Sequence, residues 1–73
     1  MNIGIIRNKI DMYKGKIINF KYNGSRNKIE EFSGIILETY PSIFIVKDNM
    51  DNLKAFSYSD VLIHKLIIKG NNL

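Results

Sequence analysis

The sequence contains no cysteine and no tryptophan, and it has a single histidine. Without cysteine, no disulfide and no thiolate metal site can form, and His64 alone cannot build a zinc site unless several carboxylates gather around it. We therefore expect no metal ion and no cofactor. A domain of 73 residues without these supports has marginal stability, and this favours self-association, most simply as a homodimer.

Long apolar runs are also missing. None approaches the roughly 20 residues that a membrane-spanning helix needs, so we expect no membrane contact. The apolar residues 3–6 are soon followed by Arg7, Lys9 and Asp11, which is unlike a secretory signal peptide. The expectation is a cytoplasmic protein that forms one domain over residues 1–73, with residues 70–73 as a frayed tail.

The charge is unevenly distributed along the chain. The formal net charge is +4. Residues 7–28 carry basic side chains with Asp11 as the one acid, whereas acids outnumber lysines from residue 29 onward. A basic first third is suited to a polyanion or to the acidic face of another protein. A solvated surface that keeps a small protein soluble explains the same pattern.

The beginning of the chain has helical periodicity. Ile3, Ile6, Ile10 and Tyr13 recur at a spacing that places them on one stripe, which predicts a short amphipathic helix over residues 2–14. Asn2 is the expected N-cap, and Gly15 is the expected residue just beyond the C-terminal end.

From Lys16 the period changes to two, which is typical of β-strands. Asn23-Gly24 predicts a hairpin, because both residues tolerate a positive φ. Gly34 predicts a bulge or sharp bend within a long second strand. The expected strands are 16–22, 28–40, 43–47, 53–57 and 63–69, with one helical turn at 59–62. This order predicts an all-β fold, a small five-stranded SH3-like or Sm-like barrel over residues 16–69 with a short N-terminal α-helix.

Two of the expected strand segments, residues 35–37 and 43–46, are apolar on both faces. A barrel strand that is exposed to water on its outside alternates apolar and polar residues instead. Either the N-terminal helix or a second subunit must therefore cover the outer face.

Several short motifs form a specific combination. The segment Glu38-Thr39-Tyr40-Pro41-Ser42 is followed by Phe44, and residues 57–60 read Ser-Tyr-Ser-Asp. Residues 15–16, 23–28 and 33–35 add further matches. Over residues 15–69 the chain resembles the Veg family, small proteins of Gram-positive bacteria.

The resemblance implies a cytoplasmic protein with an SH3-like barrel that stimulates biofilm formation through control of gene expression. The sequence departs from the family pattern at Ser25 and Asn27, which thin the basic cluster at the hairpin, and at Phe32, which replaces a polar residue. An acidic C-terminal tail is also missing.

Enzyme chemistry needs a nucleophile, a base within reach and a group that stabilises developing charge. Ser57 and Ser59 lie near His64 in the sequence, but no nucleophile-elbow or triad motif surrounds them. Glu30 and Glu31 are strand neighbours and point to opposite faces. We therefore expect no enzyme, and we expect Ser57 or Asp60 to cap the helical turn.

The candidate binding residues combine positive charge with aromatic surface. They are Lys16, Lys21, Arg26, Lys28, Tyr40, Pro41 and Tyr58. The first hypothesis is a regulatory module that binds a protein partner, for example a transcriptional regulator, through a Tyr40-Pro41 ridge and the basic hairpin. The alternative is a small barrel that binds single-stranded nucleic acid or RNA with the same lysines and tyrosines. A third reading is a structural subunit in which the tyrosines only close the ends of the barrel.

Overall fold

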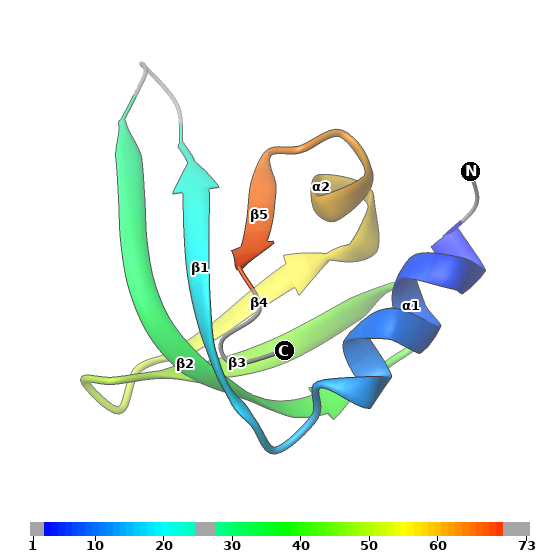
Figure 1. Ribbon diagram of the computed structural model, residues 1–73, viewed down its shortest axis with the longest axis horizontal. Helices are drawn as coiled ribbons and strands as arrows, with labels where there is room; N and C mark the ends of the chain where they lie inside the picture. Colours follow the sequence, from blue (N-terminus) through cyan, green and yellow to red (C-terminus); the bar gives the residue numbers. More distant parts are fainter. Residues whose placement is uncertain (1–2, 25–27, 70–73) are drawn as a thin grey trace.

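The structure is a computed structural model that describes residues 3–24 and 28–69. Figure 1 shows a strongly bent antiparallel sheet with two helices packed beside each other on one side. The elements are α1 (Ile3–Met12), β1 (Ile17–Asn23), β2 (Ile29–Thr39), β3 (Ile43–Asp48), β4 (Leu53–Ser57), α2 (Tyr58–Leu62) and β5 (Leu66–Lys69). The fold is mostly β, as the sequence predicted.

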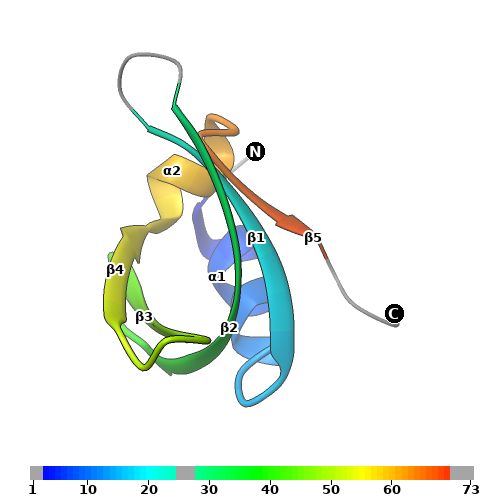
Figure 2. The same ribbon diagram turned by 90° about the vertical axis from the view of Figure 1, so that its left-hand side faces the viewer.

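The strands lie in the order β4-β3-β2-β1-β5, and every neighbouring pair is antiparallel. Among the described residues, β4 and β5 are edge strands that do not pair with each other, so the sheet is not closed into a barrel. Figure 2 shows the two ends of the sheet curving toward each other around the helices. The prediction of five strands is confirmed, whereas the described sheet is open.

The bend of β2 depends on a close approach at Gly34. An added Cβ there would lie 2.6 Å from Val46 Cγ1 and 2.9 Å from the Lys47 carbonyl oxygen. The bulge lies further along, between Ile36 and Glu38, where the register with β3 shifts. The bulge or bend predicted at Gly34 therefore has two parts. Gly34 allows β2 to approach β3 closely, and the bulge between Ile36 and Glu38 kinks β2.

The core lies on the concave, inner face of the sheet. Five aromatic side chains stack or tilt against one another there, with ring centroids 5.2 to 6.0 Å apart: Phe20, Phe32, Phe44, Phe56 and Tyr58. Phe32 extends this stack, and the Lys54 ammonium lies 4.8 Å from its ring centroid. Ile6 and Ile10 of α1 are buried in the same cluster.

Helix α1 therefore covers the inner face, and its position is fixed at the bulged end of β2. Thr39 Oγ1 donates a hydrogen bond to Asp11 Oδ1 at 2.8 Å, and Lys14 pairs with Glu38 at 3.5 Å. The helix ends at Met12, two residues before the predicted end, and Gly15 has a φ of 84° but donates its N–H to the Ile36 carbonyl of β2 rather than to the last turn of the helix. Asn2 lies outside the described residues.

In the two segments noted in the sequence, Leu37 and Ile43 are 37% and 39% exposed, and the sheet exposes further apolar side chains on its outer face. Ile17 and Leu53 are 61% and 67% exposed. They lie at the two ends of one cross-strand row, because Ile17 pairs with Ile35, Ile35 with Lys47, and Lys47 with Leu53. Helix α1 packs against the inner face through Ile6 and Ile10, and cover of the outer face by a second subunit stays a prediction.

Three local predictions need correction. Asn23 is the last residue of β1, neither Asn23 nor Gly24 has a positive φ, and the Gly24 N–H donates to the Lys28 carbonyl, so the hairpin loop is longer than a two-residue turn. The fifth strand begins at Leu66 rather than at residue 63, because His64 adopts a φ of 62° in the turn after α2. Helix α2 starts one residue earlier than predicted.

The turn between β3 and β4 is organised by a buried carboxylate. Asp48 Oδ1 accepts hydrogen bonds from the N–H groups of Met50 and Asn52, both at 2.9 Å. The bond from Asn52 is the largest influence on the pKa of Asp48, and although partial burial opposes it, the pKa of this carboxyl is lowered. Asp51 takes the left-handed conformation within the turn, with a φ of 65°.

Candidate functional site

The Tyr40-Pro41 turn presents an exposed aromatic ring on a fixed backbone. The Tyr40 side chain is 47% exposed, and Pro41 is exposed beside it. The Tyr40 N–H donates to the Ile43 carbonyl at 2.8 Å, while the Tyr40 carbonyl accepts the Tyr58 hydroxyl at 2.7 Å. A third bond runs from the Tyr58 N–H to the Ser42 carbonyl at 3.3 Å. The backbone of the turn is therefore held by β3 and by the first residue of α2, while Tyr40 and Pro41 are exposed.

Tyr58, a predicted contact residue, does not lie on the surface. It is fully buried in the aromatic core, and its hydroxyl is used inside the molecule. Burial is the main reason that the pKa of Tyr58 is raised. A side chain with no exposed area cannot form a contact surface, so this residue supports Tyr40 instead of binding beside it. The sequence analysis had considered this structural role as an alternative.

The predicted basic residues do not form one cluster with Tyr40. Lys16 lies just before β1, while Lys28 lies just before β2 at the opposite end of this strand pair. Lys21 lies on the outer face of β1, between Glu31 of β2 and Ile67 of β5. Arg26 lies outside the described residues. Figure 1 shows the end of β1 and the start of β2 far from the other end of β2, which Tyr40 follows.

Acidic side chains neutralise only some of the lysines. The described ion pairs are Lys14–Glu38, Lys47–Asp51, Lys54–Glu30 and Lys69–Glu31. Lys65 lies 5.8 Å from the centroid of the Tyr22 ring. Within residues 3–24 and 28–69, Lys9, Lys16, Lys21 and Lys28 belong to no ion pair.

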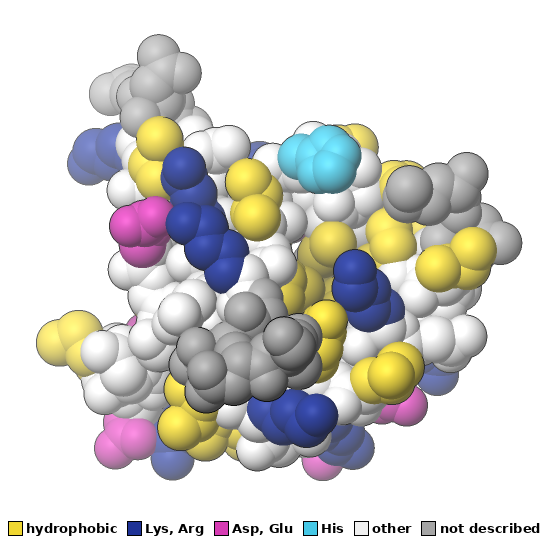
Figure 3. All heavy atoms as spheres, viewed as in Figure 1, with side chains coloured by type: hydrophobic (Ala, Val, Ile, Leu, Met, Phe, Trp, Pro, Cys, Tyr) yellow, Lys and Arg dark blue, Asp and Glu magenta, His cyan; other side chains and the backbone are white. Residues whose placement is uncertain are grey.

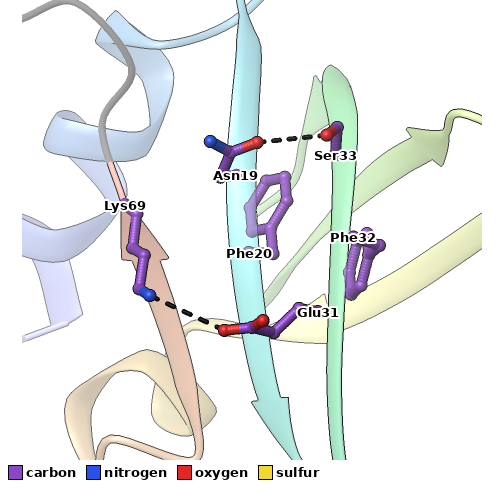
Figure 4. Close-up of a pocket in the computed structure, with 6 residues that line it drawn as sticks. All are labelled: Asn19, Phe20, Glu31, Phe32, Ser33 and Lys69. Atoms are coloured by element: carbon purple, nitrogen blue, oxygen red, sulfur yellow. Dashed lines mark hydrogen bonds and ion pairs between the residues drawn. The ribbon is translucent and has the colours of Figure 1, made fainter.

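A shallow polar pocket lies on the outer face where β5, β1 and β2 run side by side. Figure 4 shows its polar side chains directed toward one another. Ser33 Oγ donates to Asn19 Oδ1 at 3.0 Å, and Lys69 reaches across β1 to Glu31 at 3.7 Å. The groups that could bind a ligand are thus already paired with each other, and we assign no ligand to this pocket.

The residues considered for catalysis are separated by their structural roles. Ser57 Oγ accepts the Asp60 N–H at 3.2 Å and so caps α2, which settles which residue forms the cap. His64 is exposed in the turn that follows. No group of three or more His, Cys, Asp or Glu residues that could hold a metal ion occurs in the described part of the chain.

The sequence analysis missed a groove between α1, α2 and β5. Its volume is about 300 Å³, and its wall includes Lys9 of α1, His64 and three consecutive residues of β5, Leu66, Ile67 and Ile68. Only the helical stripe of Ile6 and Ile10 pointed to it, because those residues form part of its wall. The groove exists because β5 is an edge strand, which no local pattern reveals.

The sequence model of one protein family matches residues 1–69, nearly the whole chain. That family is described as the biofilm formation stimulator VEG. The chain belongs to the VEG family. The match confirms the resemblance that was drawn from the Glu-Thr-Tyr-Pro-Ser segment and its companions. No curated protein matches the chain. No helix among residues 3–24 and 28–69 is long and apolar enough to cross a membrane.

Proposed function

We propose that this VEG protein is a non-enzymatic cytoplasmic regulatory module. It stimulates biofilm formation through control of gene expression, and it acts by binding a protein partner. The family description supports the link to biofilm formation. The observation that carries the binding part is the Tyr40 ring, 47% exposed on a turn whose backbone is fixed by three hydrogen bonds.

An exposed aromatic side chain on a fixed backbone is suited to protein recognition. Tyrosine is enriched among the few residues that dominate binding energy at interfaces. Because the backbone of the turn is already fixed, binding to a partner costs little further conformational entropy. Pro41 adds a further restricted residue, and Ile43 contributes 39% exposed apolar surface at the start of β3. Together they form a small apolar ridge.

The alternative, single-stranded nucleic acid, needs aromatic rings beside basic side chains. Tyr58 is buried, and Tyr22 is partly buried against Phe56 with Lys65 over its ring. Tyr40 lies at the end of β2 opposite Lys28. The separation of Tyr40 from Lys28 favours a protein partner over a stacking platform that joins this ring to the hairpin.

We also infer that the sheet is an SH3-like barrel that is open between β4 and β5. The sequential pairing of β1 to β4, the return of β5 to β1, and the sharply bent β2 support this reading. The family resemblance supports it further.

The exposed outer row supports a homodimer. Ile17 and Leu53 are largely exposed at its ends, with the partly buried Ile35 between them. Lys47 interrupts the row between Ile35 and Leu53, and a larger exposed apolar patch rimmed by polar residues is typical of an interaction site. We propose that a second copy covers this row.

The proposed function is tested in the native host by replacing the gene with a Tyr40→Ala variant. The Tyr40 carbonyl still accepts the Tyr58 hydroxyl, so the fold is expected to survive. The matched control is Met50→Ala, which removes a side chain that is 76% exposed in the β3–β4 turn. Biofilm mass and the transcripts of biofilm genes are measured at equal protein levels. Tyr40→Ala is expected to lower both several-fold, while Met50→Ala leaves both unchanged. Wild-type values for Tyr40→Ala would refute the proposal.

A further inference from the structure

The groove between α1, α2 and β5 has the free edge of a β-strand as one wall. Consecutive side chains of a strand point to opposite faces. Leu66, Ile67 and Ile68 nevertheless all line the same groove, so the backbone edge of β5 borders it. A free strand edge presents unpaired N–H and C=O groups that another extended chain can use.

The register identifies which backbone groups are free. The Asn23 N–H donates to the Lys65 carbonyl at 2.8 Å, so residues 23 and 65 form a hydrogen-bonded pair. In an antiparallel ladder, hydrogen-bonded and non-hydrogen-bonded pairs alternate. Leu66 opposite Tyr22 and Ile68 opposite Phe20 therefore form non-hydrogen-bonded pairs. Their N–H and C=O groups point away from β1, toward the groove.

The floor of the groove is apolar and its charge has one sign. Ile6, Ile10 and Leu66 are buried at its base. Tyr13 adds a phenol to the wall, the basic side chains of the groove are Lys9 and His64, and no carboxylate lines it. Neither side chain has a hydrogen-bond or ion-pair partner among residues 3–24 and 28–69. Figure 3 shows hydrophobic side chains gathered in this hollow, with basic and histidine side chains at its margin and acidic ones elsewhere on the face.

We propose that this groove binds an extended, acidic and apolar peptide segment of a partner protein, which pairs with β5 as an added strand. The backbone of the segment bonds to Leu66 and Ile68, its apolar side chains fill the floor, and a carboxylate meets the Lys9 ammonium. Strand addition of this kind takes its affinity from main-chain bonds and its specificity from alternate side-chain pockets. Charge complementarity favours an acidic segment over a basic one, because the ionisable side chains in the wall are cations or hydrogen-bond donors and none is a carboxylate.

This inference rests on the proposed protein-binding function, but it concerns a surface separate from the Tyr40 ridge. Its failure can therefore be distinguished. Loss of the groove interaction leaves the Tyr40 phenotype in place, whereas loss of the Tyr40 phenotype leaves peptide binding to β5 unaffected.

The test is an NMR titration of the full chain with a capped octapeptide of alternating Val and Glu. The expected result is slowed amide exchange at Leu66 and Ile68, whose N–H groups become hydrogen-bonded, with no change at Ile67. The same peptide with N-methyl groups on alternate residues, which removes its backbone donors, is expected to lose the effect. An alternating Val and Lys peptide should bind more weakly than the Glu peptide.

Lys9→Glu should weaken binding of the Glu peptide by several-fold up to about tenfold, because it replaces an attractive contact with a repulsive one. The matched control, Lys16→Glu, makes the same charge change outside the groove and should leave the affinity unchanged. Circular dichroism confirms that both variants fold.

Equal affinities for the two variants, or unchanged exchange at Leu66 and Ile68 with millimolar peptide, would overturn the proposal. Protection that rises with protein concentration alone, which indicates a second copy, or protection by oligouridine, which indicates nucleic acid, would overturn it too.

Discussion

The Tyr58 hydroxyl donates a hydrogen bond to the Tyr40 carbonyl oxygen at 2.7 Å. One tyrosine is fully buried and the other is 47% exposed. The bond therefore links the aromatic core to the turn that carries the exposed ring. Because Tyr58 is also the first residue of α2, the same contact joins the end of β2 to the helix that precedes β5.

Tyr58→Phe should destabilise the protein by about 1 kcal/mol, because it removes this bond and leaves the Tyr40 carbonyl without its partner. The measurement is the free energy of unfolding in urea. Tyr40→Phe is the matched control, since it removes a hydroxyl from a largely exposed ring and should change stability little. Equal midpoints for Tyr58→Phe and the wild type would contradict this role for the bond.

Gly34→Ala should destabilise the protein by about 1–3 kcal/mol, the range for forcing extra atoms into a packed interior. The new methyl group would lie 2.6 Å from Val46 Cγ1 and 2.9 Å from a backbone oxygen. Gly24→Ala is the comparison, because the nearest atom to its Cβ lies at 3.4 Å. The account fails here if the two variants lose similar, small amounts of stability in urea unfolding.

Asp48 should make the stability of the protein sensitive to acid. Its pKa lies below the ordinary value of 3.8 in the folded state, chiefly because of the hydrogen bond from the Asn52 N–H. The ionised group therefore stabilises the fold above the pKa of the unfolded chain, and this contribution is lost as the pH falls through the folded pKa.

The melting temperature of the wild type should fall more steeply with acid than that of Asp48→Asn. Asp51→Asn, at an exposed carboxylate paired with Lys47, should follow the wild-type curve. Parallel curves for the wild type and Asp48→Asn would show that this carboxylate has no such role.

The outer apolar row predicts a concentration-dependent dimer. Leu53→Lys should shift sedimentation equilibrium toward the monomer, because it places a charge in the proposed interface. Met50→Lys makes the same kind of change at an exposed residue in the neighbouring turn and should leave the equilibrium unchanged. A wild-type protein that remains monomeric at millimolar concentration would rule out the dimer.

Periodicity predicted most of the fold. The alternation of Ile18 and Phe20 with Asn19 and Lys21 predicted both side chains in the core, and the stripe of Ile6 and Ile10 predicted an amphipathic helix without showing what it packs on. These predictions hold because burial of apolar surface dominates where a single element has one apolar face. The family was also evident from the sequence, since its motifs span most of the chain.

Long-range geometry could not be predicted from these patterns. Whether β5 meets β4 depends on how far β2 bends, and no local pattern encodes that angle. His64 was placed in a strand because its neighbours are apolar, although a left-handed turn follows α2 there. Tyr58 and Tyr40 have similar sequence surroundings, yet one is buried and the other is not. Their difference arises from tertiary packing.

The central claim is that the protein acts by binding another protein through the Tyr40 ridge. The most direct measurement is recovery of partners from the native cytoplasm with tagged wild type, Tyr40→Ala and a variant that combines Arg26→Ala with Lys28→Ala, each with and without nuclease. The account predicts one defined protein that survives nuclease, is retained by the double variant in moderate salt and is lost with Tyr40→Ala. Recovery of nucleic acid alone, released by the double variant and weakened steeply by salt, would contradict it.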